Sequence, residues 1–121
     1  METKALRILL ADDNRDVRSA LGLLLETRSG AIIVGEATTM GSLLEQAAAT
    51  LPDVVFLDGE LRGKPEAGRI VALRSVAPDA QIVVISARPE SAALGFEADA
   101  FVYKIDPPEQ ILAVLKERNN K

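Results

Sequence analysis

The sequence of 121 residues contains no cysteine and no histidine. Without cysteine the chain has no disulfide, no thiolate nucleophile and no cysteine metal site. Without histidine it lacks the commonest general base and the commonest zinc ligand. Any chemistry must therefore use carboxylates, hydroxyls, lysines and arginines.

The chain also lacks a long apolar run and a cluster of basic residues. No run approaches the roughly 18 residues that a membrane span needs, and the first residues lack the apolar core of a signal peptide. The net charge of −4 provides no basic surface for a phosphate backbone. We therefore expect a cytoplasmic protein that binds neither membrane nor nucleic acid directly.

The composition is that of a folded domain. Hydrophobic residues make up 48% of the chain and charged residues 26%, which is typical of soluble globular proteins. A chain of this length forms one core. We therefore expect a single domain over residues 1–121, without a linker.

Five short apolar runs, rich in β-branched residues, alternate with five helical patterns. This alternation predicts right-handed βαβ units, and hence an α/β fold with a doubly wound parallel sheet covered by helices on both faces. The predicted strands cover residues 6–11, 31–36, 54–58, 81–86 and 100–104. The predicted helices cover residues 14–28, 40–51, 66–76 and 89–95, with a fifth from about 107; Pro65 is expected to begin the third and Asp106 to cap the fifth.

Polar side chains stand where four of these strands end. Asp12 and Asp13 follow the first strand, Asp58 ends the third, Ser86 ends the fourth and Lys104 ends the fifth. In open parallel sheets ligands lie outside the carboxyl ends of the strands. We therefore expect these five side chains to gather at one edge. Taken singly, the aspartates could instead cap a helix, and the serine and lysine could be ordinary surface residues.

Together the five side chains predict a phosphoryl site. Two carboxylates about 5 Å apart repel by roughly 3 kcal/mol at an effective dielectric of about 20, so a cation must lie among them. Oxygen ligands of this kind favour Mg²⁺. Lys104 and Ser86 can stabilise phosphoryl oxygens, and Asp58, central in the sheet, can act as the nucleophile that forms an acyl phosphate. Since the chain has no histidine, the phosphoryl group must come from another molecule.

These residues resemble the receiver domains of bacterial two-component response regulators, over nearly the whole chain. Asp12 and Asp13 are similar to the acidic pair of that family, Asp58 to its phosphoacceptor, Ser86 to its Ser/Thr switch residue and Lys104 to its lysine. The run 51–58 is especially similar to receivers that precede helix-turn-helix DNA-binding domains.

The resemblance implies a flavodoxin-like sheet with strand order 2-1-3-4-5 and a Mg²⁺ ion as cofactor. Asp13 and Asp58 would hold the ion directly, Asp12 through water, and Glu60 through its backbone carbonyl. Asp58 would take the phosphoryl group from a sensor histidine kinase or a phosphotransfer protein. The chain would thus be a phosphorelay regulator rather than an enzyme, promoting only its own phosphotransfer and dephosphorylation.

The resemblance also implies a switch. Ser86 and Lys104 would follow the new phosphoryl oxygens, and Phe101 falls where these receivers carry an aromatic residue that changes rotamer. The face of the fourth helix, fifth strand and fifth helix would be the output surface or a homodimer surface. Phe101 could also be an ordinary core residue.

Two stretches depart from the family pattern. The phosphoacceptor of these receivers is often followed by an apolar residue and a proline, whereas here Leu61 is followed by Arg62. The lysine is often followed by a cis proline, whereas here Ile105 follows Lys104. A cis bond before a residue other than proline costs roughly 2.5 to 4 kcal/mol, so we expect a trans bond.

Two other functions remain open from the sequence. A phosphohydrolase with an aspartyl nucleophile usually carries a second aspartate two residues later, and here Glu60 stands there. A receiver fold used only for binding would have lost the phosphorylation chemistry. Glu60 and Arg88 lie two residues beyond Asp58 and Ser86. For the receiver we add the hypothesis that these two residues screen the acyl phosphate from water and so set its lifetime.

Overall fold

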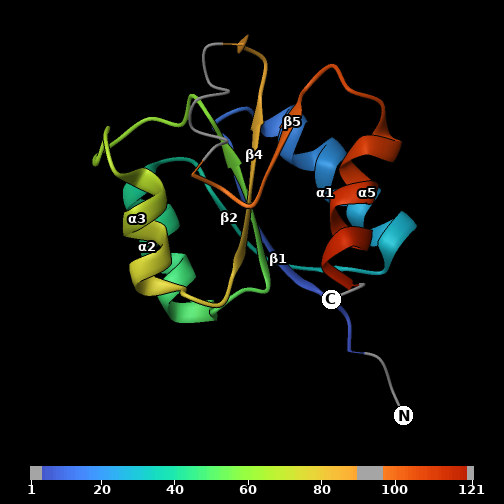
Figure 1. Cartoon of the computed structure of the whole chain (residues 1–121), viewed down its shortest axis with the longest axis horizontal. Helices are drawn as coiled ribbons and strands as arrows, with labels where there is room; N and C mark the ends of the chain where they lie inside the picture. The colour runs from blue at the N-terminus through green and yellow to red at the C-terminus, as the bar shows by residue number, and fades with distance from the viewer. Residues whose placement is uncertain (1–3, 90–96, 120–121) are drawn as a thin grey trace.

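The computed structural model describes residues 4–89 and 97–119. Five parallel strands form one sheet in the order β2-β1-β3-β4-β5. The predicted α/β fold and strand order are therefore confirmed (Figure 1). The strands are β1 (Arg7–Ala11), β2 (Ile32–Ala37), β3 (Val54–Asp58), β4 (Gln81–Ser86) and β5 (Ala100–Tyr103).

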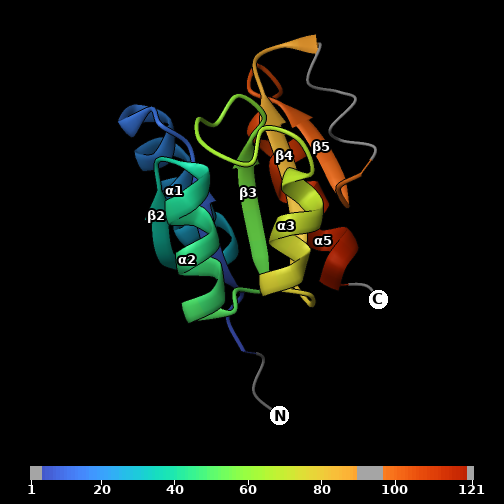
Figure 2. The same ribbon diagram turned by 90° about the vertical axis from the view of Figure 1, so that its left-hand side faces the viewer.

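Helices cover both faces of this sheet (Figures 1 and 2). α1 and α5 lie on one face, and α2 and α3 lie on the other. The fourth predicted helix, at 89–95, falls almost entirely outside the described residues. No helix of the described part of the chain is long and apolar enough to cross a membrane. The described helices are α1 (Arg15–Ser29), α2 (Met40–Thr50), α3 (Arg69–Val76) and α5 (Pro108–Asn119).

The sheet is buried on both faces because its inner strands are apolar at successive positions. In β1, Ile8 and Leu10 pack with the core beneath α1 and α5, whereas Leu9 and Ala11 pack with the core beneath α2 and α3. Neighbouring side chains of a strand point to opposite faces, so a continuous apolar run fills both cores. All of β3, including the terminal aspartate, is buried in the same way.

The turns around α1 and α2 follow their sequence signals. The side chain of Asn14 accepts two backbone N–H groups of the first turn of α1, and the hydroxyl of Thr39 caps α2. Gly30 ends α1 with a φ of 70°, a left-handed conformation that glycine adopts without steric cost. Because Asn14 caps α1 only three residues after β1 ends, Asp12 and Asp13 between them stay at the edge of the sheet.

The third helix starts later than predicted. α3 begins at Arg69 rather than near residue 66, because Gly68 before it has a φ of 69° and so cannot belong to a right-handed helix. Pro65 therefore lies in the loop and does not begin the helix. The peptide bond between Lys64 and Pro65 is cis.

The predicted cap of the last helix is also wrong. α5 begins at Pro108, a position that proline favours because its missing N–H would have no helical partner. Asp106 thus lies one residue too early to be the N-cap. Its carboxylate instead accepts a hydrogen bond from the backbone N–H of Tyr103 at 2.9 Å, which closes the turn after β5.

Candidate functional site

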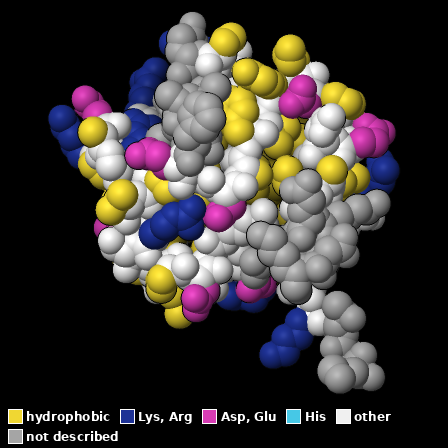
Figure 3. All heavy atoms as spheres, in the orientation of Figure 1, with side chains coloured by type: hydrophobic (Ala, Val, Ile, Leu, Met, Phe, Trp, Pro, Cys, Tyr) yellow, Lys and Arg dark blue, Asp and Glu magenta, His cyan; other side chains and the backbone are white. Residues whose placement is uncertain are grey.

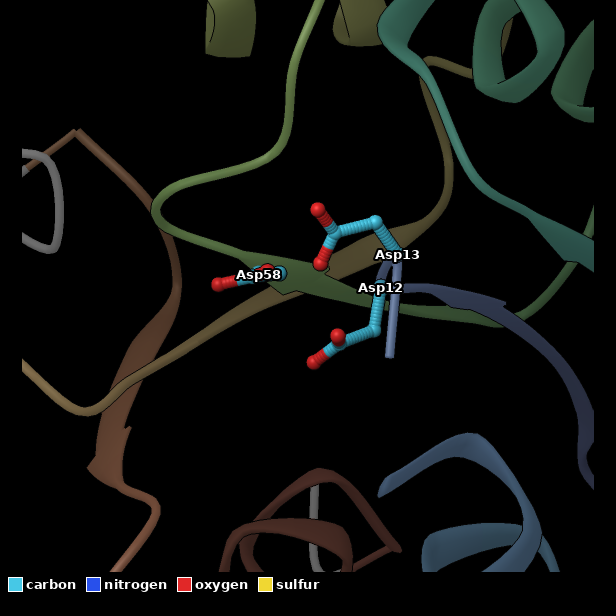
Figure 4. A group of neighbouring side chains, drawn as sticks. All are labelled: Asp12, Asp13 and Asp58. Atoms are coloured by element: carbon cyan, nitrogen blue, oxygen red, sulfur yellow. The ribbon is translucent and has the colours of Figure 1, made fainter. Parts of the chain in front are cut away.

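Three carboxylates meet at the carboxyl edge of the sheet. β1 and β3 are adjacent and in parallel register, so Asp12 and Asp13 after β1 lie beside Asp58 at the end of β3. One oxygen from each of the three residues lies within 4.8 Å of the others. Asp12 and Asp58 are buried and Asp13 is exposed. Figure 4 shows the three side chains close together where β1 and β3 end.

Lys104 lies among these carboxylates. Its Nζ is 2.8 Å from Oδ2 of Asp12 and 3.6 Å from Oδ1 of Asp58. The backbone N–H of Lys104 donates to the carbonyl of Ser86 at 2.8 Å, although β5 ends one residue before the predicted end. The pairing of β4 with β5 therefore carries the lysine to the sheet edge where the carboxylates meet.

The electrostatics of the site favour an added cation. The pKa of Asp58 is raised, chiefly by burial and also by the charges of Asp12 and Glu60, against the backbone N–H of Glu60 and the charge of Lys104. Burial alone would lower the pKa of Lys104. The hydrogen bond to Asp12 and the charges of Asp58 and Asp12 outweigh burial, so the pKa of Lys104 is raised. Lys104 is thus an ammonium at neutral pH, and one ammonium does not neutralise three carboxylates.

Ser86 is fully buried beside Asp58 and has three hydrogen-bond contacts. Its hydroxyl donates to Oε2 of Glu60 at 2.6 Å, lies 3.2 Å from the carbonyl of Arg88, and accepts the backbone N–H of Arg88 at 2.9 Å. The backbone N–H of Glu60 donates to Oδ1 of Asp58 at 3.1 Å. Sequence reasoning placed Glu60 and Arg88 near the pocket, but it missed the bond from Ser86 to Glu60.

The loop after Asp58, where the sequence departs from the family, is held against α2. The side chain of Leu61 is fully buried, and the carbonyl of Arg62 accepts the backbone N–H of Met40 at 2.8 Å, at the first turn of α2. Gly63 has a φ of 109°, and an added Cβ would lie 3.2 Å from the nitrogen of Met40. The exposed guanidinium of Arg62 lies 3.8 Å from Asp13.

Arg18 is a site residue that sequence reasoning missed. Its guanidinium donates to the backbone carbonyl of Asp12 at 2.8 Å and to the carboxylate of Glu36 at 2.9 Å. It therefore ties the end of β1 to β2 through the first turns of α1. The available signal was its place one turn after the N-cap Asn14, which puts it over the carboxyl end of β1.

The two aromatic residues of β5 contact each other. The rings of Phe101 and Tyr103 are 4.9 Å apart at their centroids and nearly perpendicular, a favoured aromatic geometry. Phe101 is half-buried and packs against the core beneath α2 and α3. A rotamer change of Phe101 stays a prediction.

The peptide bond after the lysine is trans, as predicted. Among the described residues the cis bond is that between Lys64 and Pro65, and Ile105 after Lys104 is 90% exposed. The loop after Lys104 therefore differs from the resemblance in both respects: it has neither the proline nor the cis bond.

A cavity of about 310 Å³ opens between α1 and α5 and reaches Lys104. In Figure 3 hydrophobic side chains gather at the upper right of the molecule, where α1 and α5 lie in Figure 1. The ammonium of Lys104 is therefore bordered by the carboxylates on one side and by an apolar surface on the other. The cavity is lined by Val17, Ala20, Leu21, Leu24, Ile85, Lys104, Asp106, Pro108 and Ile111.

Curated relatives match nearly the whole chain. The sensory transduction protein LytT of Bacillus cereus is 33% identical over 113 residues, which is 92% of this chain and 46% of LytT. The chain spans about half the length of the curated relatives it matches.

Two solved structures share the fold. The signal receiver domain of the response regulator NarL from Mycobacterium tuberculosis has a TM-score of 0.82 at 29% identity, over 98% of this chain and 100% of that one. A response regulator from Burkholderia pseudomallei, solved with a phosphorylated aspartic acid, a calcium ion and citrate, has a TM-score of 0.75 at 27% identity, over 89% of this chain and 65% of that one.

The family match extends over residues 8–116 and is to the response regulator receiver domain. That span includes every side chain of the site at the sheet edge. The chain therefore belongs to the response regulator receiver domain family.

Proposed function

We propose that Asp58 accepts a phosphoryl group from the phosphohistidine of a sensor histidine kinase or a phosphotransfer protein. The observation that carries this proposal is a buried Asp58 with Lys104 at 3.6 Å and two further carboxylates beside it. One oxygen of Asp58 forms a bond to phosphorus while the bond from phosphorus to the imidazole nitrogen breaks, and its electron pair leaves with the imidazole. The relative with a phosphorylated aspartic acid supports this chemistry.

The oxygen ligands of the site suit Mg²⁺. We propose that Asp13 and Asp58 hold the ion directly, Asp12 through water and Glu60 through its backbone carbonyl. The ion supplies charge neutralisation for the carboxylates and for the phosphoryl oxygens. Lys104, already held near Asp58, supplies a second positive charge.

The transfer would act as a signal. In this proposal Ser86 and Lys104 engage the phosphoryl oxygens, and β5 with its aromatic residues repacks against its neighbours. The surface of the fourth predicted helix, β5 and α5 is the proposed output or homodimer surface. The chain would act in the cytoplasm as one domain over residues 1–121, with no chemistry beyond its own phosphotransfer and dephosphorylation.

Mapping the phosphorylated residue tests this function. After incubation with acetyl phosphate and Mg²⁺, mass spectrometry should find one phosphoryl group, on Asp58, and Asp58→Asn should stay unmodified. Asp79→Asn is the matched control, because Asp79 is exposed and precedes β4, whose opposite end carries Ser86. Modification of Asp58→Asn to the parental level would contradict the assignment.

The same reaction separates the two other functions. Steady release of phosphate from many equivalents of ester would favour a phosphohydrolase, in which Glu60 acts as the acid or base. An unmodified parent chain would favour a receiver fold used only for binding. A single stoichiometric phosphorylation, followed by slow loss, favours the receiver.

We also propose that Glu60 and Arg88 set the lifetime of the acyl phosphate by screening it from water. Glu60 accepts the hydroxyl of Ser86 through its carboxylate, and Arg88 donates its backbone N–H to the same hydroxyl. Both residues are therefore attached beside the residue that follows the register partner of Asp58 in β4. Dephosphorylation of Glu60→Asn and Arg88→Ala should be about threefold to tenfold faster, equivalent to roughly 0.7–1.4 kcal/mol in the barrier. Unchanged rates in both variants would refute the screening role.

A further inference from the structure

The hydrogen bond between Ser86 and Glu60 competes with any other bond that the hydroxyl of Ser86 could donate. A serine hydroxyl carries one proton and can therefore donate to one acceptor at a time. Here the shortest contact is the one to Oε2 of Glu60, at 2.6 Å, the length of a charge-assisted O–H···O⁻ bond. The carbonyl of Arg88 is farther away, at 3.2 Å.

In the proposed function, which this inference extends, the same hydroxyl donates to a phosphoryl oxygen on Asp58. The proton of Ser86 cannot serve Glu60 and the phosphoryl group together. The hydroxyl must leave Glu60 before it can engage the new oxygen. Because Ser86 is fully buried, no bulk water stands ready to replace the lost partner.

We propose that Glu60 is a positioning residue that holds Ser86 away from the phosphoryl site and so disfavours the activated state. The contact joins the loop after β3 to the end of β4, the two segments that flank the phosphoacceptor. When a ligand binds only a minor conformation, its apparent dissociation constant is the intrinsic one divided by the fraction of protein in that conformation. The carboxylate of Glu60 thus sets the activation threshold through its bond to Ser86, independently of any screening of water.

A double-mutant cycle tests this proposal with beryllofluoride and Mg²⁺ as the phosphoryl mimic. In the parent background, Glu60→Gln replaces the charge-assisted acceptor by a neutral one, so the dissociation constant measured by calorimetry should fall by about threefold to tenfold. In the Ser86→Ala background there is no hydroxyl to hold, so Glu60→Gln should improve binding by less than about twofold. Glu45→Gln, an exposed glutamate of α2, controls for the change in net charge.

An equal effect of Glu60→Gln in both backgrounds would overturn the proposal, because Glu60 would then act only by its charge. The same cycle in urea unfolding without ligand should show positive coupling between Glu60 and Ser86, and absence of coupling would also overturn it. Failure of the proposed function would give a different result: the parent protein would bind no beryllofluoride, although Glu60 and Ser86 would still be coupled in urea unfolding. That result would refute the role of Glu60 in activation together with the proposed function.

Discussion

At the scale of single residues, Asp58 is costly for the unliganded fold. Burial is the largest cause of its raised pKa, so the folded protein binds the proton of this carboxyl group more tightly than the unfolded chain does. The stabilising contribution of a raised carboxyl pKa is present below the ordinary value of 3.8 and is lost as pH rises through the folded pKa. At neutral pH the charged Asp58 therefore destabilises the protein.

Asp58→Asn should therefore raise the free energy of unfolding at neutral pH without metal, by about 1–2 kcal/mol. The gain should shrink as the pH is lowered and vanish below the ordinary pKa of 3.8, where the carboxyl is protonated in both states. Urea unfolding at a series of pH values measures it. A constant difference at all pH values would show that side-chain shape, not charge, is responsible.

Lys104 has the opposite effect, since it partly compensates two buried carboxylates. Lys104→Met keeps most of the aliphatic stem but leaves Asp12 without its ion pair at 2.8 Å, and should cost about 1–3 kcal/mol in unfolding free energy. Lys64→Met is the control: Lys64 and Glu66 form an exposed pair at 3.5 Å, and such pairs contribute under about 1 kcal/mol. Equal losses in both variants would refute the role of Lys104.

At the scale of the elements, the loop between β3 and α3 is shaped by α2. Leu61 fills the core beneath α2 and α3, and Arg62 supplies the acceptor for the first turn of α2. The loop lacks the proline that related receivers place soon after the phosphoacceptor. Its conformation comes instead from these contacts and from Gly63, whose backbone approaches Met40 closely.

Gly63→Ala should therefore destabilise the protein by about 1–3 kcal/mol, because its φ of 109° strains any other residue and its Cβ would crowd Met40. Thermal unfolding measures the loss. Gly41→Ala is the matched control, since nothing lies within 4 Å of its Cβ and alanine favours the helix; it should be neutral or stabilising. Similar losses in both variants would contradict the close approach.

The elements also show where sequence reasoning succeeds. The strands were predictable because apolar runs such as that before Asp58 end in polar residues, and a parallel sheet brings those ends together. The start of α3 was not, because a proline such as Pro65 favours the first turn of a helix, whereas here the left-handed Gly68 delays the helix to Arg69. The bond from Ser86 to Glu60 depends on how a loop folds back, which no periodicity encodes.

At the scale of the whole molecule, one edge of the sheet concentrates negative charge contributed by distant parts of the chain. Asp12, Asp13 and Asp58 come from two segments and meet within 4.8 Å. A cation that binds only this folded arrangement must stabilise the entire fold. The proposed metal binding would therefore be coupled to global stability.

Mg²⁺ at about a hundredfold above its dissociation constant should raise the free energy of unfolding by about 2.7 kcal/mol. Thermal unfolding with and without Mg²⁺ measures this, and a chelator should reverse it. Asp13→Asn should lose most of the increase, because Asp13 is one of the three carboxylates at the site. An increase of the same size in Asp13→Asn would place the cation elsewhere.

Tyr103 gives the molecule an optical reporter of its own. It is the only tyrosine of a chain without tryptophan, it pairs in register with Ser86, and its ring meets that of Phe101. Excitation of tyrosine therefore reads the β4–β5 edge and no other part of the protein. Repacking of this edge can be followed in real time by emission from the native sequence, without a label or an engineered residue.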